Sequence, residues 1–180
     1  QSPLEFGRAV ERLFSDASRA AAPPGIAAMT DVGLSRTLNE DSWGWVQLGD
    51  DASLVVVADG MGGHEAGEVA SHLAVDTICP DARERYSEGG VLDANALEEM
   101  LRNAFQEANN TVKGLAEERH NDMGTTMVAA LVAGETGIIA NVGDSRAYRM
   151  RNQILEQISK DHSLVARMVE QNRLSPEEAR

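Results

Sequence analysis

The sequence predicts an α+β domain in which mostly antiparallel strands pack with helices, and three observations favour this class. Leu54–Ala58 (LVVVA) is a continuous, mostly β-branched run, typical of a strand buried on both faces. Two stretches, at about residues 65–78 and 93–118, have apolar residues at helical spacing. Three strand-like runs joined by glycine-containing turns follow: Thr125–Ala133, Gly137–Val142 and Ser145–Arg151. Helices inserted among paired strands indicate a β-sandwich flanked by helices.

The N-terminal part divides at a Pro/Gly sequence. Residues 3–20 place apolar side chains at roughly helical spacing, and Ala-Ala-Pro-Pro-Gly ends that pattern. We therefore expect an amphipathic helix and linker over residues 1–25, and one domain over residues 26–180. Within it, Ile26–Thr30 and Trp43–Leu48 read as short strands.

Further elements are expected between and after the main ones. Asp93 and Asn95 are candidate caps for the second helix. Gln153–Ile158 reads as a fourth late strand and His162–Gln171 as a helix. Ser175-Pro-Glu-Glu has a capping box with proline at the first helical position, so another helix begins there.

Composition limits the classes of function. The 180 residues carry a net charge of −13, which argues against nucleic acid and anionic membrane surfaces as partners. No apolar run is long enough to span a bilayer and no secretory leader is evident, so we expect a cytoplasmic protein. A single cysteine, Cys79, excludes an internal disulfide; it reads as a core or helix-end residue more readily than as a catalytic thiol.

Acidic residues stand at the ends of predicted strands. Asp59 directly follows the Leu54–Ala58 run, and Glu40 and Asp41 precede the strand at Trp43. Carboxylate and carbonyl oxygens are the ligands that hard divalent cations prefer. Asp59 could instead cap the next helix, and the Asn39-Glu40-Asp41 sequence could be a polar turn.

Two other polar residues, Arg36 and Asp144, have similar double interpretations. Arg36 could clamp a phosphate through two hydrogen bonds or be an ordinary surface arginine. Asp144 lies in a Gly-Asp-Ser-Arg sequence that could be a simple hairpin turn or could add a carboxylate at the same end of the sheet. Asp161 could cap a helix.

The order of these sequences along the chain resembles the successive motifs of bacterial PP2C-type (PPM family) protein Ser/Thr phosphatases. The resemblance covers about residues 26–180 and rests on five strings: TDVGLSRTLNED (30–41), VVVADGMGGHEAGEVAS (55–71), MGTT (123–126), NVGDSRAY (141–148) and SKDHS (159–163).

The resemblance implies a dinuclear Mn²⁺ or Mg²⁺ site, with a third ion in bacterial members. Asp59 would bridge two ions, the Gly60 carbonyl would bind one, and Asp41 would act through metal-bound water. Asp144 would bind the third ion. Two metals at such a site can activate a water without any protein nucleophile.

The resemblance also assigns roles beyond the metals. Arg36 would hold the substrate phosphate, Glu40 would orient groups around the metals, and His64 would be the general acid toward the leaving serine or threonine oxygen. Thr125, Thr126 and Ser145 would be structural. The implied partners are phosphorylated Ser/Thr proteins and an opposing Ser/Thr kinase.

The chain departs from the family after Asp144. The family continues past this endpoint with an aspartate in a Ser-Asp-Gly motif and a late Asp-Asn pair, and neither occurs here. We therefore expect the C-terminal part of the fold to be missing and this piece to bind metal weakly. Two alternatives stay open: a regulatory module that binds phosphoprotein without turnover, and a dinuclear hydrolase of small phosphoesters.

Overall fold

The computed structural model describes residues 25–62, 66–89, 93–163, 168 and 173–175. The predicted helix over residues 3–20, most of the predicted 162–171 helix, the helix start at Ser175-Pro-Glu-Glu and His64 therefore lie outside the described residues.

Strands and helices alternate in blocks along the described residues. In order, the elements are β1 (Asp41–Gly49), β2 (Ala52–Met61), α2 (Ala66–Gly89), α3 (Ala94–Arg119), β3 (Gly124–Thr125), β4 (Met127–Ala133), β5 (Thr136–Val142), β6 (Tyr148–Arg151) and β7 (Ile154–Gln157).

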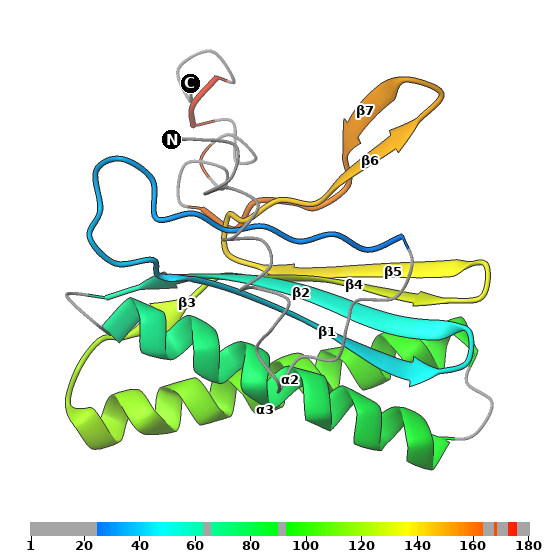
Figure 1. The fold of residues 1–180 in the computed structure, drawn as a ribbon, viewed down its shortest axis with the longest axis horizontal. Coiled ribbons are helices and arrows are strands. Elements are labelled where there is room, and N and C mark those ends of the chain that lie inside the picture. Colours follow the sequence, from blue (N-terminus) through cyan, green and yellow to red (C-terminus); the bar gives the residue numbers. More distant parts are fainter. Residues whose placement is uncertain (1–24, 63–65, 90–92, 164–167, 169–172, 176–180) are drawn as a thin grey trace, which may run out of the picture.

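The strands form one antiparallel sheet and one separate hairpin. The sheet has the order β1-β2-β4-β5, with the short β3 paired to the end of β2, and β6 pairs only with β7. Both helices cover one face of this sheet, whereas the β6–β7 hairpin and the segment before β1 lie on the other side (Figure 1). The α+β class is confirmed. Within the described residues, the second sheet consists of the two-stranded β6–β7 hairpin alone.

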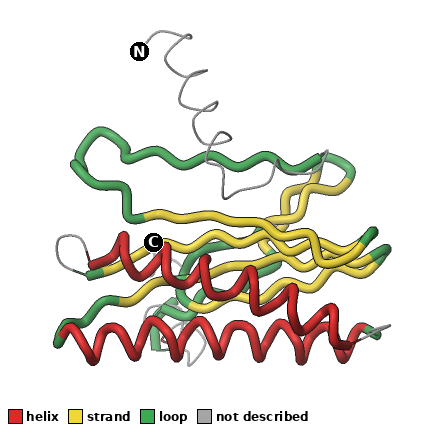
Figure 2. Tube along the Cα trace, turned by 60° about the horizontal axis from the view of Figure 1, so that its bottom comes forward, coloured by secondary structure: helices red, strands yellow, loops and turns green. Residues whose placement is uncertain are grey.

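The core lies between the sheet and the helix pair α2 and α3, which run next to each other on the same face (Figure 2). In β2, Leu54, Val56 and Ala58 are buried toward the helices, whereas Val57 is 48% exposed. The prediction that this run is buried on both faces was therefore wrong. An antiparallel sheet with helices on one side buries alternate residues only.

Helix α2 continues past the point where the sequence indicated its end. Pro80 removes one backbone donor, and we expected the helix to stop at Ile78. It instead runs to Gly89, because Ala82 is fully buried and Tyr86 packs against the core on the far side of the proline. Of the two candidate caps of α3, Asp93 is the N-cap: its carboxylate accepts a hydrogen bond from the backbone N–H of Ala96 at 2.9 Å, and Asn95 lies within the helix.

One strand prediction was wrong and another was wrong in part. Residues 26–30 form no strand, and the side chain of Thr30 instead hydrogen-bonds to the loop that precedes β1. Residues 145–147 are also not strand, because Ser145 and Ala147 bond to Thr126 and Ser159 rather than to a neighbouring strand. No helix in the described part of the chain combines the length and the apolar character needed to cross a membrane.

Candidate functional site

Two aspartates face each other where β1 begins and β2 nears its end. The antiparallel register pairs Asp41 with Asp59. Directly paired residues point to the same face of a sheet, with Cβ atoms about 4.5–5.5 Å apart. Ser42 and Ala58, the next pair, are buried on the helix side, so the two carboxylates point to the opposite face. The fold thus places two acidic groups together away from the core.

The position of Asp41 is fixed by a small polar network. The Asn39 side-chain oxygen accepts a hydrogen bond from the backbone N–H of Asp41 at 3.1 Å. The Asn39 amide donates to the Thr30 hydroxyl at 2.9 Å, and that hydroxyl donates to the Asp41 carboxylate at 3.4 Å. We predicted no role for Thr30 or Asn39 from the sequence. Both residues lie in the same string as Asp41, TDVGLSRTLNED (30–41), and this closeness in sequence could have suggested that they contact it.

Glu40 ties the start of β1 to the end of β2 and to α2. Its backbone carbonyl accepts a hydrogen bond from the Gly60 N–H at 3.0 Å. Its carboxylate accepts one from Arg36 at 2.6 Å, and it lies so close to Gly67 that a Cβ there would meet Glu40 Oε1 at 2.6 Å. Glu40 is largely buried while the Arg36 side chain is 63% exposed, so the guanidinium keeps donors free to face solvent.

Thr126 joins Asp59 to the loop after β5. The Thr126 N–H donates to the Asp59 carbonyl at 2.8 Å, and the Asp59 N–H donates back to the Thr126 hydroxyl at 3.3 Å. The same hydroxyl pairs with that of Ser145 at 2.5 Å, and the Thr125 hydroxyl donates to the Asp59 carbonyl at 3.0 Å. These threonines and Ser145 therefore act structurally, as the family resemblance implied.

The electrostatics at Asp59 reflect a cluster of like charges. Burial raises the pKa of Asp59, and the nearby carboxylates of Asp41, Asp144 and Glu40 raise this pKa further. The Arg36 guanidinium opposes them by favouring the charged form. Asp144 lies in a loop far from Asp59 in sequence, yet it is near enough in space to affect this carboxyl.

The donor atoms near Asp59 are carboxylate and carbonyl oxygens, the types that a hard divalent cation prefers. Carboxylate oxygens repel one another at Asp59, and a cation between them would relieve that repulsion. Gly60 would also offer its carbonyl, and no side chain fits there because a Cβ would meet the Gly67 carbonyl oxygen at 2.0 Å. Among the residues described, however, no three His, Cys, Asp or Glu side chains gather closely enough to hold an ion by themselves.

Of the residues singled out from the sequence, the structure brings six into one neighbourhood: Arg36, Glu40, Asp41, Asp59, Gly60 and Asp144. Cys79 lies elsewhere. Its sulfur is close to Gly44, which belongs to the helix-facing side of β1, whereas Asp59 points to the other face. This placement favours the structural interpretation of Cys79 over the catalytic one.

Comparisons with known proteins agree with this geometry. The family model for protein phosphatase 2C matches residues 34–172. The serine/threonine phosphatase Stp of Listeria monocytogenes is 43% identical over 152 residues, which are 83% of this chain and 59% of that protein. The chain thus spans about three-fifths of the length of the curated Stp relatives it matches.

Solved structures give the same result for the fold. The phosphatase Stp1 of Staphylococcus aureus has a TM-score of 0.72 and 39% identity, over 83% of this chain and 58% of that one. The catalytic domain of the phosphatase PstP, solved with two manganese ions, has a TM-score of 0.68 and 36% identity, over 85% of this chain and 62% of that one. The matched range, the paired aspartates and these likenesses lead to one conclusion: the chain belongs to the protein phosphatase 2C family.

Proposed function

We propose that the protein containing this chain hydrolyses phosphoserine and phosphothreonine in other proteins, with the help of divalent cations. The observation that carries the proposal is the pairing of Asp41 with Asp59 on adjacent strands, with Glu40 and Arg36 beside them. The relatives named as serine/threonine phosphatases support the choice of substrate class.

The acidic residues would hold two or three Mn²⁺ or Mg²⁺ ions. Asp59 and the Gly60 carbonyl would bind directly, Asp41 would act through an intervening water, and Asp144 would serve a further ion. The manganese ions of the PstP structure support this choice of metal. Such cations, when bound, lower the pKa of a coordinated water and stabilise the charge of a displacement at phosphorus.

Arg36 would hold the substrate phosphate. One guanidinium nitrogen of Arg36 donates to Glu40, and this bond fixes the orientation of the guanidinium. The remaining N–H donors can bind two phosphate oxygens in parallel. Glu40 in turn would orient both this guanidinium and the backbone at Gly60, because it contacts both. His64 follows the end of β2 in sequence and would donate a proton to the leaving oxygen of the serine or threonine.

Phosphorylated proteins are the proposed partners of the site, because relatives of this family are named for that substrate. A Ser/Thr kinase that adds the phosphate is the corresponding opposing partner. The kinase and the cytoplasmic location stay predictions from the sequence.

Steady-state kinetics of the full-length protein with a phosphothreonine peptide and Mn²⁺ test these roles. Asp59→Asn should abolish turnover, whereas Arg36→Ala should mainly raise KM because it removes phosphate binding. Arg102→Ala is a matched control, since Arg102 also bonds a glutamate four residues away, at 2.7 Å, but on α3. It should leave both constants unchanged.

The competing interpretations give different results in the same assay. Phosphate release from small phosphoesters but not from phosphopeptides would favour a small-molecule hydrolase. Binding of the phosphopeptide without release of phosphate by the wild-type protein would favour a non-catalytic module. Either result would overturn the proposed function.

A further inference from the structure

The loop that carries Asp144 is hydrogen-bonded to a second segment, residues 157–162. The proposed mechanism gives no role to any residue of this segment. Two backbone hydrogen bonds join the loop to this segment. The His162 N–H donates to the Gly143 carbonyl at 2.8 Å, and the Ile158 N–H donates to the Ala147 carbonyl at 2.9 Å. The Ser159 hydroxyl accepts a hydrogen bond from the Ala147 N–H at 2.8 Å. Both ends of the loop 143–147 are therefore bonded to this segment.

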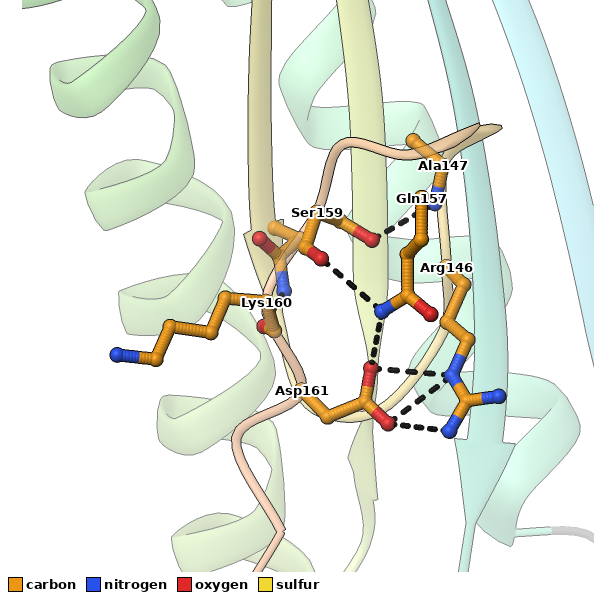
Figure 3. Close-up of polar contacts among 7 residues, drawn as sticks. Arg146, Ala147, Gln157, Ser159, Lys160 and Asp161 are labelled. Atoms are coloured by element: carbon orange, nitrogen blue, oxygen red, sulfur yellow. Dashed lines mark hydrogen bonds and ion pairs between the residues drawn. The ribbon is translucent and has the colours of Figure 1, made fainter. Parts of the chain in front are cut away.

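An ion pair closes the contact between these bonds (Figure 3). The Arg146 guanidinium donates to both oxygens of Asp161, from Nε at 3.1 and 2.9 Å and from Nη2 at 2.5 Å. The Gln157 amide adds a hydrogen bond to Asp161 at 3.0 Å and another to the Ser159 carbonyl at 3.0 Å. Half of the Arg146 side chain is exposed, whereas only 14% of the Asp161 side chain is. Although Arg146 lies at the surface, bonds from two guanidinium nitrogens to both carboxylate oxygens fix the direction of the pair.

The other side of the loop rests on the residue that anchors Asp59. Gly143 has φ +90 and packs so tightly on Thr126 that a Cβ would meet its Cγ2 at 2.7 Å. The Ser145 hydroxyl pairs with that of Thr126, whose backbone and hydroxyl both bond to Asp59. The neighbours of Asp144 in sequence are therefore held on two sides. Gly143 and Ser145 contact Thr126, and Arg146 pairs with Asp161.

From this arrangement we infer that Asp161 and Arg146 are positioning residues: their ion pair acts through the loop 143–147 to set Asp144 at the metal site. The inference rests on the proposed function, because it takes Asp144 as a metal ligand. Partners that orient a metal ligand commonly change metal affinity by about 10–100-fold when they are replaced. Asp161 acts through the backbone rather than on Asp144 directly, so the lower end of that range applies.

Calorimetric titration of the full-length protein with Mn²⁺ tests the inference. Asp161→Asn keeps the size of the side chain and should weaken Mn²⁺ binding at the site that includes Asp144 by about tenfold. The matched control is Glu156→Gln, which breaks the Arg149–Glu156 pair at 2.6 Å on the exposed β6–β7 hairpin. That change should alter Mn²⁺ affinity by less than about twofold, as expected for an exposed pair.

A double-mutant cycle separates positioning from general stability. In an Asp144→Asn background, Asp161→Asn should cause no further loss of Mn²⁺ affinity, because its effect passes through Asp144. An equal loss in both backgrounds, or a loss no larger than that of Glu156→Gln, would overturn the inference. If Asp161→Asn does not fold, Arg146→Lys gives the same comparison, since lysine keeps the charge but loses the fork.

Failure of the proposed function would look different in this experiment. If Asp144→Asn alone leaves every Mn²⁺ affinity unchanged, Asp144 is not a ligand and the metal assignment itself is wrong. If Asp144→Asn weakens binding while Asp161→Asn does not, only the positioning role fails.

Discussion

Replacing Gly60 with alanine tests whether the end of β2 and the start of α2 must touch. A Cβ at this position would meet the Gly67 oxygen at 2.0 Å, the Gly67 carbon at 2.4 Å and the Glu40 oxygen at 2.9 Å. All three are backbone atoms, and the Gly67 oxygen would have to retreat by about 1 Å before any real Cβ could fit. Overpacking that shifts backbone typically costs about 1–3 kcal/mol, and a retreat of this size places Gly60→Ala near the upper value. For a chain of this size, that loss lowers the midpoint of thermal unfolding by about 6–12 °C.

The measurement is urea unfolding of wild-type and Gly60→Ala protein, followed by circular dichroism. Gly114→Ala is the matched control, because a Cβ there has no atom within 4 Å and the position lies inside α3. The control should stabilise the protein by about 1 kcal/mol through helix propensity. A Gly60→Ala protein as stable as wild type would refute the close contact between β2 and α2.

Three further predictions concern single side chains. Asp59→Asn should stabilise the metal-free protein slightly at neutral pH, by about 0.3 kcal/mol, because the raised pKa of Asp59 means that its charged form is disfavoured in the fold and because solvent screens this exposed side chain. Urea unfolding with a chelator measures this difference, and a loss of stability would contradict it. Ser42→Ala should stabilise by about 1 kcal/mol in the same assay, since the Ser42 hydroxyl is buried and has no hydrogen-bond partner among the described residues. The Arg146 guanidinium lowers the pKa of Asp161, so Asp161 stabilises the fold above about pH 4 and this contribution disappears as pH falls through its lowered value. The stability difference between wild type and Asp161→Asn should therefore shrink on acidification, and a difference that grows would be contrary to it.

The elements were predictable where one local signal decided them. Apolar spacing indicated both helices, and β-branched runs indicated β2 and β4. The local signal failed at Pro80, where tertiary burial of Ala82 and Tyr86 outweighed the lost backbone hydrogen bond. The local signal also failed for residues 26–30. Their sequence is typical of a strand, but no strand of the described structure pairs with them.

The acidic residues that lie together could be singled out from the sequence, but the contacts between them could not. The order of acidic strings singled out Asp41, Asp59 and Asp144 as candidates. Their proximity depends on strand register and on a loop, which no local pattern encodes. The links through Thr126 and Asp161 join residues distant in sequence through side-chain hydrogen bonds, so only the folded chain reveals them.

The most direct test of the central claim is the stoichiometry of Mn²⁺ binding by the full-length protein, measured by calorimetry before and after Asp59→Asn. The proposed function predicts at least two bound ions for the full-length wild type, because the related PstP catalytic domain was solved with two, and a severe loss of binding for the variant. A wild-type protein that binds no Mn²⁺, or a variant that binds it as well as the wild type, would contradict the assignment of this cluster as a metal site.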